Sequence, residues 1–168
     1  MKLSPYSQEW KFIYKQEAKK IKNIIGDFVI DIQHIGSTAI PNIVAKPIID
    51  IVVMISSLDK AKDLIKLLTD IGYKYDEPAS SSERYLLRKG DPIQYHLSLT
   101  ALNVTFWHRQ ILFRNYLIDH PLIAKEYEKL KLKIIKKYPT GGKEYISEKS
   151  SFIQKVLELA EKDSKSGI

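Results

Sequence analysis

Apolar residues recur with helical spacing at both ends of the chain and with strand spacing between them. Residues 7–25 carry an apolar stripe of helical period, with Ser7 available as N-cap and Gly26 just after the last apolar position, which predicts a helix. Residues 28–35 alternate apolar and polar side chains, and residues 47–55 form a short β-branched run. These two segments predict strands, the second buried on both faces.

A second amphipathic helix is predicted between Ser57 and Gly72, followed by a β-hairpin that joins residues 84–88 to residues 93–99. Beyond Thr100 the apolar spacing is helical to the end of the chain. Strands in the first hundred residues and helices at both ends predict an α+β (mixed α/β) fold. We expect a mixed β-sheet flanked by helices, with a helical C-terminal third.

The length of 168 residues fits one domain, which we place at residues 1–162, followed by a small polar tail at residues 163–168 that we expect to fray. No apolar run approaches the roughly 20 residues of a membrane span, and no signal-peptide pattern opens the chain, so we expect a cytoplasmic protein without membrane contact. The chain has no Cys, which excludes disulfides and thiol chemistry. A net charge of +7 favours anionic partners without selecting one.

The densest chemical signal is the turn Gly36-Ser37-Thr38, which leaves one predicted strand shortly before Asp50 enters the next. A glycine, two hydroxyls and free backbone N–H groups are suited to holding a phosphate. A carboxylate inside a buried strand needs a partner, and Mg²⁺ bridging Asp50 to a phosphate would supply one. The alternative is a structural turn, with Asp50 paired to Lys46 or another cation.

The same stretch resembles the GrpB family, and the resemblance covers nearly the whole chain. It rests on several motifs: His34-Ile-Gly-Ser-Thr, Ala45-Lys-Pro-Ile-Ile-Asp50, Tyr95-His96-Leu97, Phe113-Arg114-Asn115-Tyr116-Leu117, His120-Pro121, Tyr127-Glu-Lys-Leu-Lys131, and Tyr145 with Lys149. Members of that family look like small relatives of the nucleotidyltransferase superfamily. The resemblance therefore implies a nucleotidyltransferase-like sheet and a nucleotide-type pocket.

In that superfamily a Gly-Ser turn grips a triphosphate and paired carboxylates hold Mg²⁺, roles that the resemblance gives to Gly36, Ser37 and Asp50. Two residues after Asp50 stands Val52, so the second carboxylate of the usual pair is missing. His34 or His96, with an ordinary pKa of about 6.5, would assist proton transfer.

Four cations are candidates for the remaining negative charge of a phosphate ligand: Lys46, Arg114, Lys131 and Lys149. Lys131 and Lys149 lie beside the apolar stripes of their helices, so they either point toward the sheet or snorkel along the edge of the core. The guanidinium of Arg114 would either clamp a phosphate or pair with Asp119 on the surface.

The leading hypothesis is a protein that binds a nucleotide or another phosphorylated small molecule, with Mg²⁺-dependent nucleotidyl transfer to an acceptor as its reaction. The rival is a non-catalytic sensor of the same fold, which the missing second carboxylate favours. Nucleic-acid binding through the stripe Lys125, Lys129, Lys133 and Lys137 is less favoured, because nearby glutamates and the lack of interleaved aromatic residues fit a solvated face.

Overall fold

The computed structural model describes residues 2–166 and contains one five-stranded mixed sheet with the strand order β1-β2-β5-β4-β3. Strands β2 and β5 run parallel, and the other neighbours are antiparallel. The strands span Val29–Ile35 (β1), Ile49–Ile55 (β2), Tyr73–Tyr75 (β3), Arg84–Lys89 (β4) and Tyr95–Ala101 (β5). The predicted strands and hairpin are confirmed, whereas the edge strand β3 was not predicted because three residues are too few to show a period of two.

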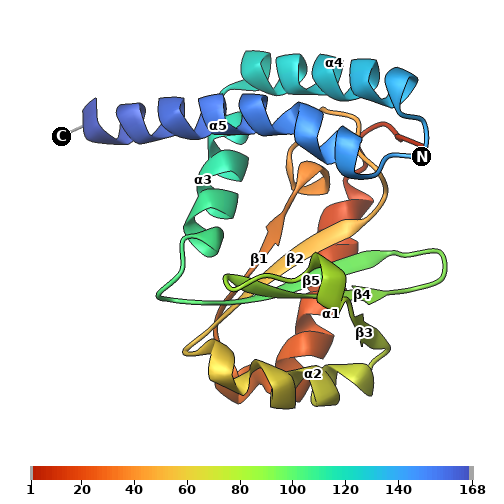
Figure 1. Ribbon diagram of the computed structural model, residues 1–168, viewed down its shortest axis with the longest axis vertical. Coiled ribbons are helices and arrows are strands. Elements are labelled where there is room, and N and C mark those ends of the chain that lie inside the picture. Colours follow the sequence, from red (N-terminus) through yellow and green to blue (C-terminus); the bar gives the residue numbers. More distant parts are fainter. Residues whose placement is uncertain (1, 167–168) are drawn as a thin grey trace.

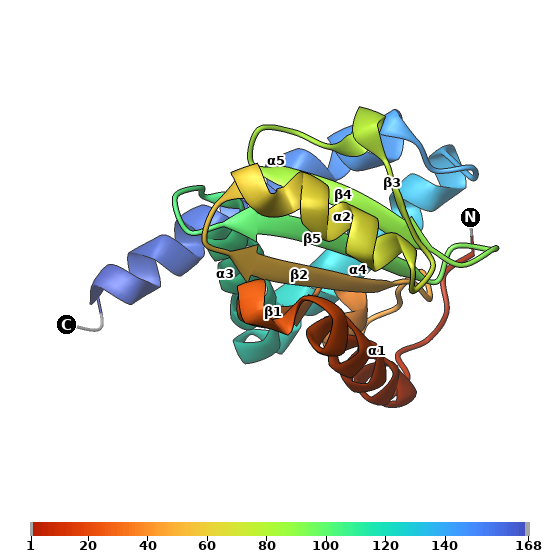
Figure 2. The same ribbon diagram turned by 90° about the horizontal axis from the view of Figure 1, so that it is seen from below.

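Helices α1 (Glu9–Ile25) and α2 (Ala61–Thr69) pack on one face of the sheet (Figure 2). The Ser7 hydroxyl accepts a hydrogen bond from the Glu9 N–H at 3.2 Å, as expected of a residue that starts a helix. The main hydrophobic core lies between these two helices and the sheet and includes Ile21, Leu64 and Ile51. Short 3-10 helices complete the connections; they span Gly26–Phe28, Ser37–Ala39, Leu58–Lys60 and Glu77–Ala79.

The C-terminal third consists of helices α3 (Phe106–Asp119), α4 (Pro121–Lys137) and α5 (Lys143–Ser166), which lie together on the other side of the molecule (Figure 1). They enclose a second core that the loop after β1 joins; its buried members are Ile40, Ile43, Tyr116, Leu117, Ala124, Tyr127, Val156 and Ala160. Helix α5 continues through Asp163 to Ser166, past the point where we expected the tail to begin. Gly167 and Ile168 lie outside the described residues.

The alternation of side chains along the strands separates a buried face of the sheet from a polar one. Ile51 of β2 and Leu97 of β5 are paired in register and point into the core under α1 and α2. Their neighbours Asp50 and His96 therefore point to the opposite face, toward the C-terminal helices. This polar face lies between the two cores.

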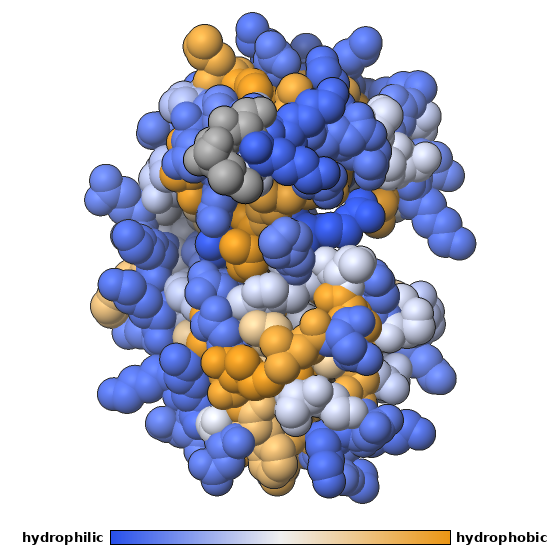
Figure 3. Space-filling model, turned by 90° about the vertical axis from the view of Figure 1, so that its left-hand side faces the viewer, coloured by the Kyte–Doolittle hydropathy of each residue, from blue (hydrophilic) through white to orange (hydrophobic). Residues whose placement is uncertain are grey.

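Hydrophilic and apolar side chains are mixed on the face drawn in Figure 3, and the largest apolar group lies in its lower half. The same view shows a hollow at the right-hand edge, between the upper and lower halves. Among the described residues, no helix has the length and the apolar character needed to cross a membrane.

Candidate anion-binding site

The turn after β1 brings the backbone of Gly36 against the carboxylate of Asp50. Gly36 has a φ of 71°, a conformation that L side chains rarely adopt, and a Cβ at this position would collide with Asp50 Oδ2. The chain then forms the 3-10 turn Ser37–Ala39, in which the Ala39 N–H donates to Gly36 O at 3.1 Å. Only glycine permits this close approach of the turn to the carboxylate.

Asp50 is paired with His96 on the neighbouring strand. The two residues share a register position in the parallel pair β2–β5, and His96 Nδ1 lies 2.9 Å from Asp50 Oδ1. The partner of the strand carboxylate is therefore a histidine rather than Lys46. A carboxylate is an acceptor, so it favours the His96 tautomer that carries its proton on Nδ1 and leaves Nε2 able to accept a proton.

Helix α4 inserts the side chain of Lys131 behind the turn, where it is only 2% exposed. Its ammonium donates to Ser37 Oγ at 3.1 Å and to Val44 O, and it lies 4.9 Å from the centre of the Tyr127 ring. Burial, and to a smaller extent the charge of Lys149, lower the pKa of Lys131 to about 7 against the opposing charge of Glu128. The glutamate is already engaged, since its oxygens accept from the Val44 N–H at 2.6 Å and from Lys125 at 2.8 Å.

Lys149 of α5 reaches the same place from the other side. Its ammonium lies 4.4 Å from the centre of the Tyr145 ring, and burial lowers its pKa against the opposing charge of Asp50. Both lysines therefore point toward the sheet. With the exposed Lys46 they bring three cations to one small cavity, in which Asp50 is the single carboxylate among the lining residues of the described part of the chain.

This cavity has a volume of about 140 Å³ and unites seven of the ten residues that the sequence had indicated. Those seven are Ser37, Thr38, Lys46, Asp50, His96, Lys131 and Lys149. Gly36 lines an adjoining cavity of about 390 Å³, which shares Asp50, His96 and Lys149 with the first. We call the two together the Asp50 site.

The larger cavity contains two arginines that the sequence analysis missed, Arg84 and Arg88 of β4. Arg84 donates to Ser98 Oγ at 3.1 Å and lies over the Phe106 ring at 5.0 Å, whereas Arg88 forms an ion pair with Asp76 at 2.5 Å. Alternate residues of a strand share a face, so Arg84 and Arg88 lie on the same face of β4. Arg88 pairs with His96 of β5, and this pairing would have placed both arginines on the face of the Asp50 site.

His34 does not join the Asp50 site, contrary to our expectation that it and His96 would serve one reaction centre. In the β1–β2 ladder His34 pairs with Ile51 and Ile35 pairs with Asp50, so His34 points to the opposite face of the sheet. Its ring stacks on Tyr14 at 4.9 Å, and Nε2 lies 2.9 Å from Thr38 Oγ1. Burial lowers the pKa of His34 to about 4, so the ring is neutral at physiological pH.

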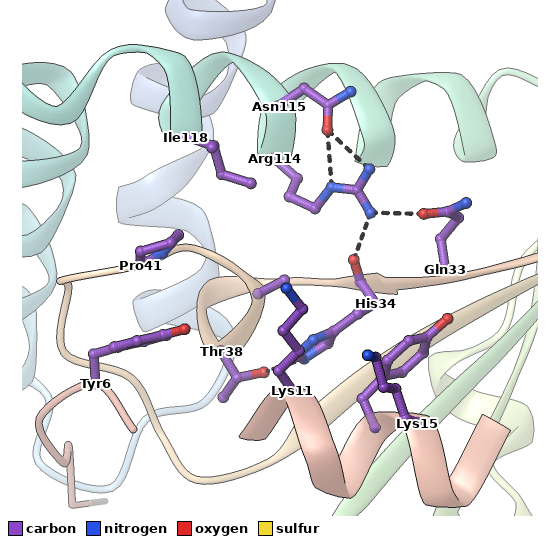
Figure 4. Close-up of a pocket in the computed structure, with 12 residues that line it drawn as sticks. Tyr6, Lys11, Lys15, Gln33, His34, Thr38, Pro41, Arg114, Asn115 and Ile118 are labelled. Carbon is purple, nitrogen blue, oxygen red and sulfur yellow. Dashed lines mark hydrogen bonds between the residues drawn. The ribbon is translucent and has the colours of Figure 1, made fainter. Parts of the chain in front are cut away.

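Arg114 is also separate from the Asp50 site, and it does not pair with Asp119. It lies on α3, which passes the edge strand β1, and Nη1 donates to His34 O at 2.7 Å and to Gln33 Oε1 at 3.0 Å. Its Nε and Nη2 both donate to Asn115 Oδ1. The guanidinium therefore covers the open edge of β1 and lines a different cavity (Figure 4).

A resident Mg²⁺ prefers six oxygen ligands in octahedral geometry. Among residues 2–166, no group of three His, Asp or Glu side chains is arranged to hold a metal ion. Asp50 Oδ1 is already bonded to His96, and Val52 is fully buried. The side chains thus do not fit a resident Mg²⁺, but one carboxylate fits an ion that is held mainly by the phosphates of a ligand.

The lysine stripe of α4 faces away from both cores. Its four members are exposed, Lys125 pairs with Glu128, and Lys137 pairs with Glu148 at 2.7 Å. These ion pairs reduce the net positive charge that the helix presents to solvent.

The sheet, its covering helices and the glycine turn against the strand carboxylate define a nucleotidyltransferase-like fold. A structure of Cid1 shares this fold with a TM-score of 0.52 at 12% identity, over 77% of this chain and 40% of that one. The sequence profile of the GrpB protein matches residues 1–159, and the chain belongs to the GrpB family.

Two relatives match over almost their whole length. The glutamate-rich protein GrpB of Alkalihalophilus pseudofirmus is 36% identical over 161 residues, which is 92% of each chain. The crystal structure of the conserved protein GrpB from Enterococcus faecalis superposes with a TM-score of 0.88 at 33% identity, covering 97% of this chain and 99% of that one. The predicted fold class and the family resemblance are confirmed.

Proposed function

We propose that this protein binds a nucleotide or another phosphorylated small molecule in the Asp50 site. The observation that carries the proposal is the pair Lys131 and Lys149, two buried or half-buried ammonium groups that face one cavity and repel each other. A phosphate placed between them and Ser37 would supply the charge that the site lacks and accept their hydrogen bonds. Thr38 and Lys46 line the same cavity and would contact the same group.

The finer proposal is Mg²⁺-dependent nucleotidyl transfer. Asp50 would contribute one oxygen to an ion that arrives with the phosphates of the ligand, where Mg²⁺ would neutralise developing charge. His96, oriented by Asp50, would take the proton of an acceptor that occupies the larger cavity between Arg84 and Lys149. The fold shared with Cid1, which is described as having RNA terminal uridylyl transferase activity, supports this reaction class.

A non-catalytic phosphate sensor is the second candidate, and Val52 favours it. Val52 is fully buried at the position where a second carboxylate would stand on β2. Without that carboxylate the site keeps its phosphate contacts and loses half of a two-metal clamp. Release of pyrophosphate from a bound triphosphate, followed by phosphorus NMR, distinguishes the enzyme from the sensor, since the sensor leaves its ligand intact.

The test is a thermal-shift panel of nucleoside triphosphates, diphosphates and monophosphates, each with and without Mg²⁺. Ligand binding to the native state raises stability in proportion to RT ln(1 + [L]/Kd). We expect a dose-dependent shift in the wild type that Lys131→Met abolishes. Lys129→Met, an exposed lysine on the same helix, is the matched control and should keep the shift.

Asp50→Asn distinguishes phosphate binding from the Mg²⁺-dependent part of the proposal. It should remove the Mg²⁺-dependent part of the shift and leave the part that does not depend on metal. The absence of a shift with every phosphate ligand, or an equal shift in wild type and Lys131→Met, would contradict binding at this site.

A further inference from the structure

A second cavity, of about 370 Å³, lies across β1 from the Asp50 site, between α1 and α3 (Figure 4). It contains the two residues, His34 and Arg114, that the sequence indicated and the Asp50 site did not include. We call it the α1–α3 cavity. Nothing in the proposed function requires it.

The charged side chains that line the α1–α3 cavity are all positive. Lys11 and Lys15 lie one helical turn apart on α1, and Arg114 faces them from α3. Among the described residues, no Asp or Glu lines the cavity. The carboxylate of Asp31 lies outside the lining and accepts from the Ile32 N–H at 2.7 Å and from Gln33 Nε2 at 3.1 Å; its charge acts on Arg114 and offsets one of the three cations in part.

Arg114 is held in place by neutral groups alone. Its hydrogen bonds go to one backbone carbonyl and two side-chain amides, so they fix the orientation of the guanidinium without neutralising it. A fixed, half-buried guanidinium facing two lysines is a receptor for a carboxylate or a phosphate group.

The other end of the cavity is apolar. Tyr6, Pro41 and Ile118 lie together away from the Arg114–Gln33 pair (Figure 4). This wall offers a flat ring and two aliphatic surfaces to the body of a ligand whose charged group lies among the cations. An inorganic anion would leave the wall without a partner.

The floor connects the α1–α3 cavity to the Asp50 site. His34 stacks on Tyr14 and contacts Thr38, and Thr38 Oγ1 donates to Ile48 O at 3.3 Å. Thr38 lines both this cavity and the smaller cavity of the Asp50 site. A ligand in the α1–α3 cavity therefore lies close to Thr38, which also lines the Asp50 site.

We propose that the α1–α3 cavity is a second binding site, for a small organic anion whose carboxylate or phosphate group lies between Lys11, Lys15 and Arg114 and whose apolar body packs on Tyr6, Pro41 and Ile118. It is distinct from the Asp50 site and shares with it the lining residue Thr38.

The test uses three probes: phenyl phosphate, benzoate and inorganic phosphate. Each is titrated into isotope-labelled protein, and binding is followed by the amide signals of Lys15 and Asn115 for this cavity and of Ser37 and Lys131 for the Asp50 site. The variant is Lys11→Gln/Lys15→Gln. The control Lys19→Gln/Lys22→Gln removes two exposed charges from the same helix at residues that do not line the cavity.

At the signals of Lys15 and Asn115 we expect an organic probe to bind about tenfold more tightly than inorganic phosphate, and the Lys11→Gln/Lys15→Gln variant to lose about tenfold in affinity. The control variant and Lys131→Met should both retain binding there. Tyr6→Ala should remove the preference for the organic probe. Comparison of benzoate with phenyl phosphate then identifies which anionic group the site takes.

Three results would overturn the proposal. These are no saturable change at Lys15 and Asn115 with either organic probe, equal weakening in variant and control, and loss of binding in Lys131→Met. The last would place the ligand in the Asp50 site. Because the two sets of signals are read separately, failure of this proposal does not imply failure of the proposed function.

Discussion

Two lysines withdrawn from solvent, Lys89 and Lys131, meet opposite environments. The ammonium of Lys89 lies 2.6 Å from Glu17 Oε1, a carboxylate that is only 1% exposed and that also accepts from the Tyr73 hydroxyl at 3.2 Å. The ammonium of Lys131 has neutral oxygens as hydrogen-bond partners and a second lysine, Lys149, across the cavity.

The difference separates a structural charge from a functional one. The cluster Glu17–Tyr73–Lys89 joins α1 to β3 and β4 and is complete within the chain. Among the described residues, no carboxylate is within ion-pair distance of either ammonium of the Lys131–Lys149 pair, and the charges of Asp50 and Glu128 offset their burial only in part. The burial of the pair is therefore unfavourable until an anion arrives. Removal of Lys89 should therefore lower the stability of the fold, whereas removal of Lys131 should weaken ligand binding.

The largest expected effect is the loss of stability in Lys89→Met. It removes the nearer cation of the buried Glu17 carboxylate and leaves only the exposed Lys20, whose ammonium lies 3.4 Å from Glu17 Oε2. We therefore expect the lower end of the about 3–5 kcal/mol that breaking a buried pair costs. Lys131→Met removes an unpaired charge together with two hydrogen bonds, so we expect a change within about 1 kcal/mol. Urea unfolding of the two variants at pH 7 measures both, and equal losses would remove the distinction between the lysines.

The next largest effect is the pH dependence of stability that His34 causes. His34 is a buried base that contacts Thr38 and has no ion-pair partner among the described residues. Its pKa of about 4 lies below the ordinary 6.5, so between these values the unfolded chain binds more protons than the folded one. The folded state should therefore lose up to about 3 kcal/mol as the pH falls from 6.5 to 4. Unfolding measured at pH 7 and pH 4.5 should show a smaller difference in His34→Gln than in the wild type.

Gly36→Ala should affect both stability and ligand binding, because Gly36 lies against the carboxylate of Asp50. The new Cβ meets Asp50 Oδ2 in a backbone conformation that disfavours alanine, so we expect a loss of about 2 kcal/mol in stability. Displacement of Asp50 should also remove any Mg²⁺-dependent ligand shift. Gly26→Ala, at a glycine whose Cβ would meet nothing within 4 Å, is the control and should leave both properties near the wild-type values.

The smallest expected effect is the pH dependence of anion binding. Lys131 has a folded pKa of about 7, so above that pH the free protein holds a neutral amine while a bound anion favours the ammonium. Binding must then take up a proton, and affinity for a nucleotide should fall by up to about tenfold per pH unit between pH 7.5 and 9. The stability of the free protein should rise over the same interval. Lys131→Met should lose both trends, and a constant wild-type affinity would contradict the assignment.

Much of the Asp50 site could be predicted because local patterns determine it. The glycine turn, the buried strand with one acid and the alternation of the hairpin strand indicated Ser37, Asp50 and His96, and the apolar stripes of the helices placed Lys131 and Lys149 near the sheet. Each of these inferences depends on the period of one element.

The errors arose where the position depends on how two elements pair. His34 lies on the face opposite Asp50 because of the β1–β2 register, which a connection of irregular structure determines. Arg114 reaches the edge of β1 because Tyr116 and Leu117 pack α3 onto Ile40 and Ile43. Neither the register nor the helix position is visible in the period of a single segment.

The most direct test of the unpaired-lysine account is a calorimetric titration of inorganic tripolyphosphate into wild type, Lys131→Met and Lys129→Met at pH 8. The probe carries phosphate charge without a base or sugar, so it reports only on the cations. The account predicts saturable binding with proton uptake in the wild type and in Lys129→Met, and an affinity about tenfold weaker without proton uptake in Lys131→Met. Equal affinity and equal proton uptake in all three proteins would contradict it.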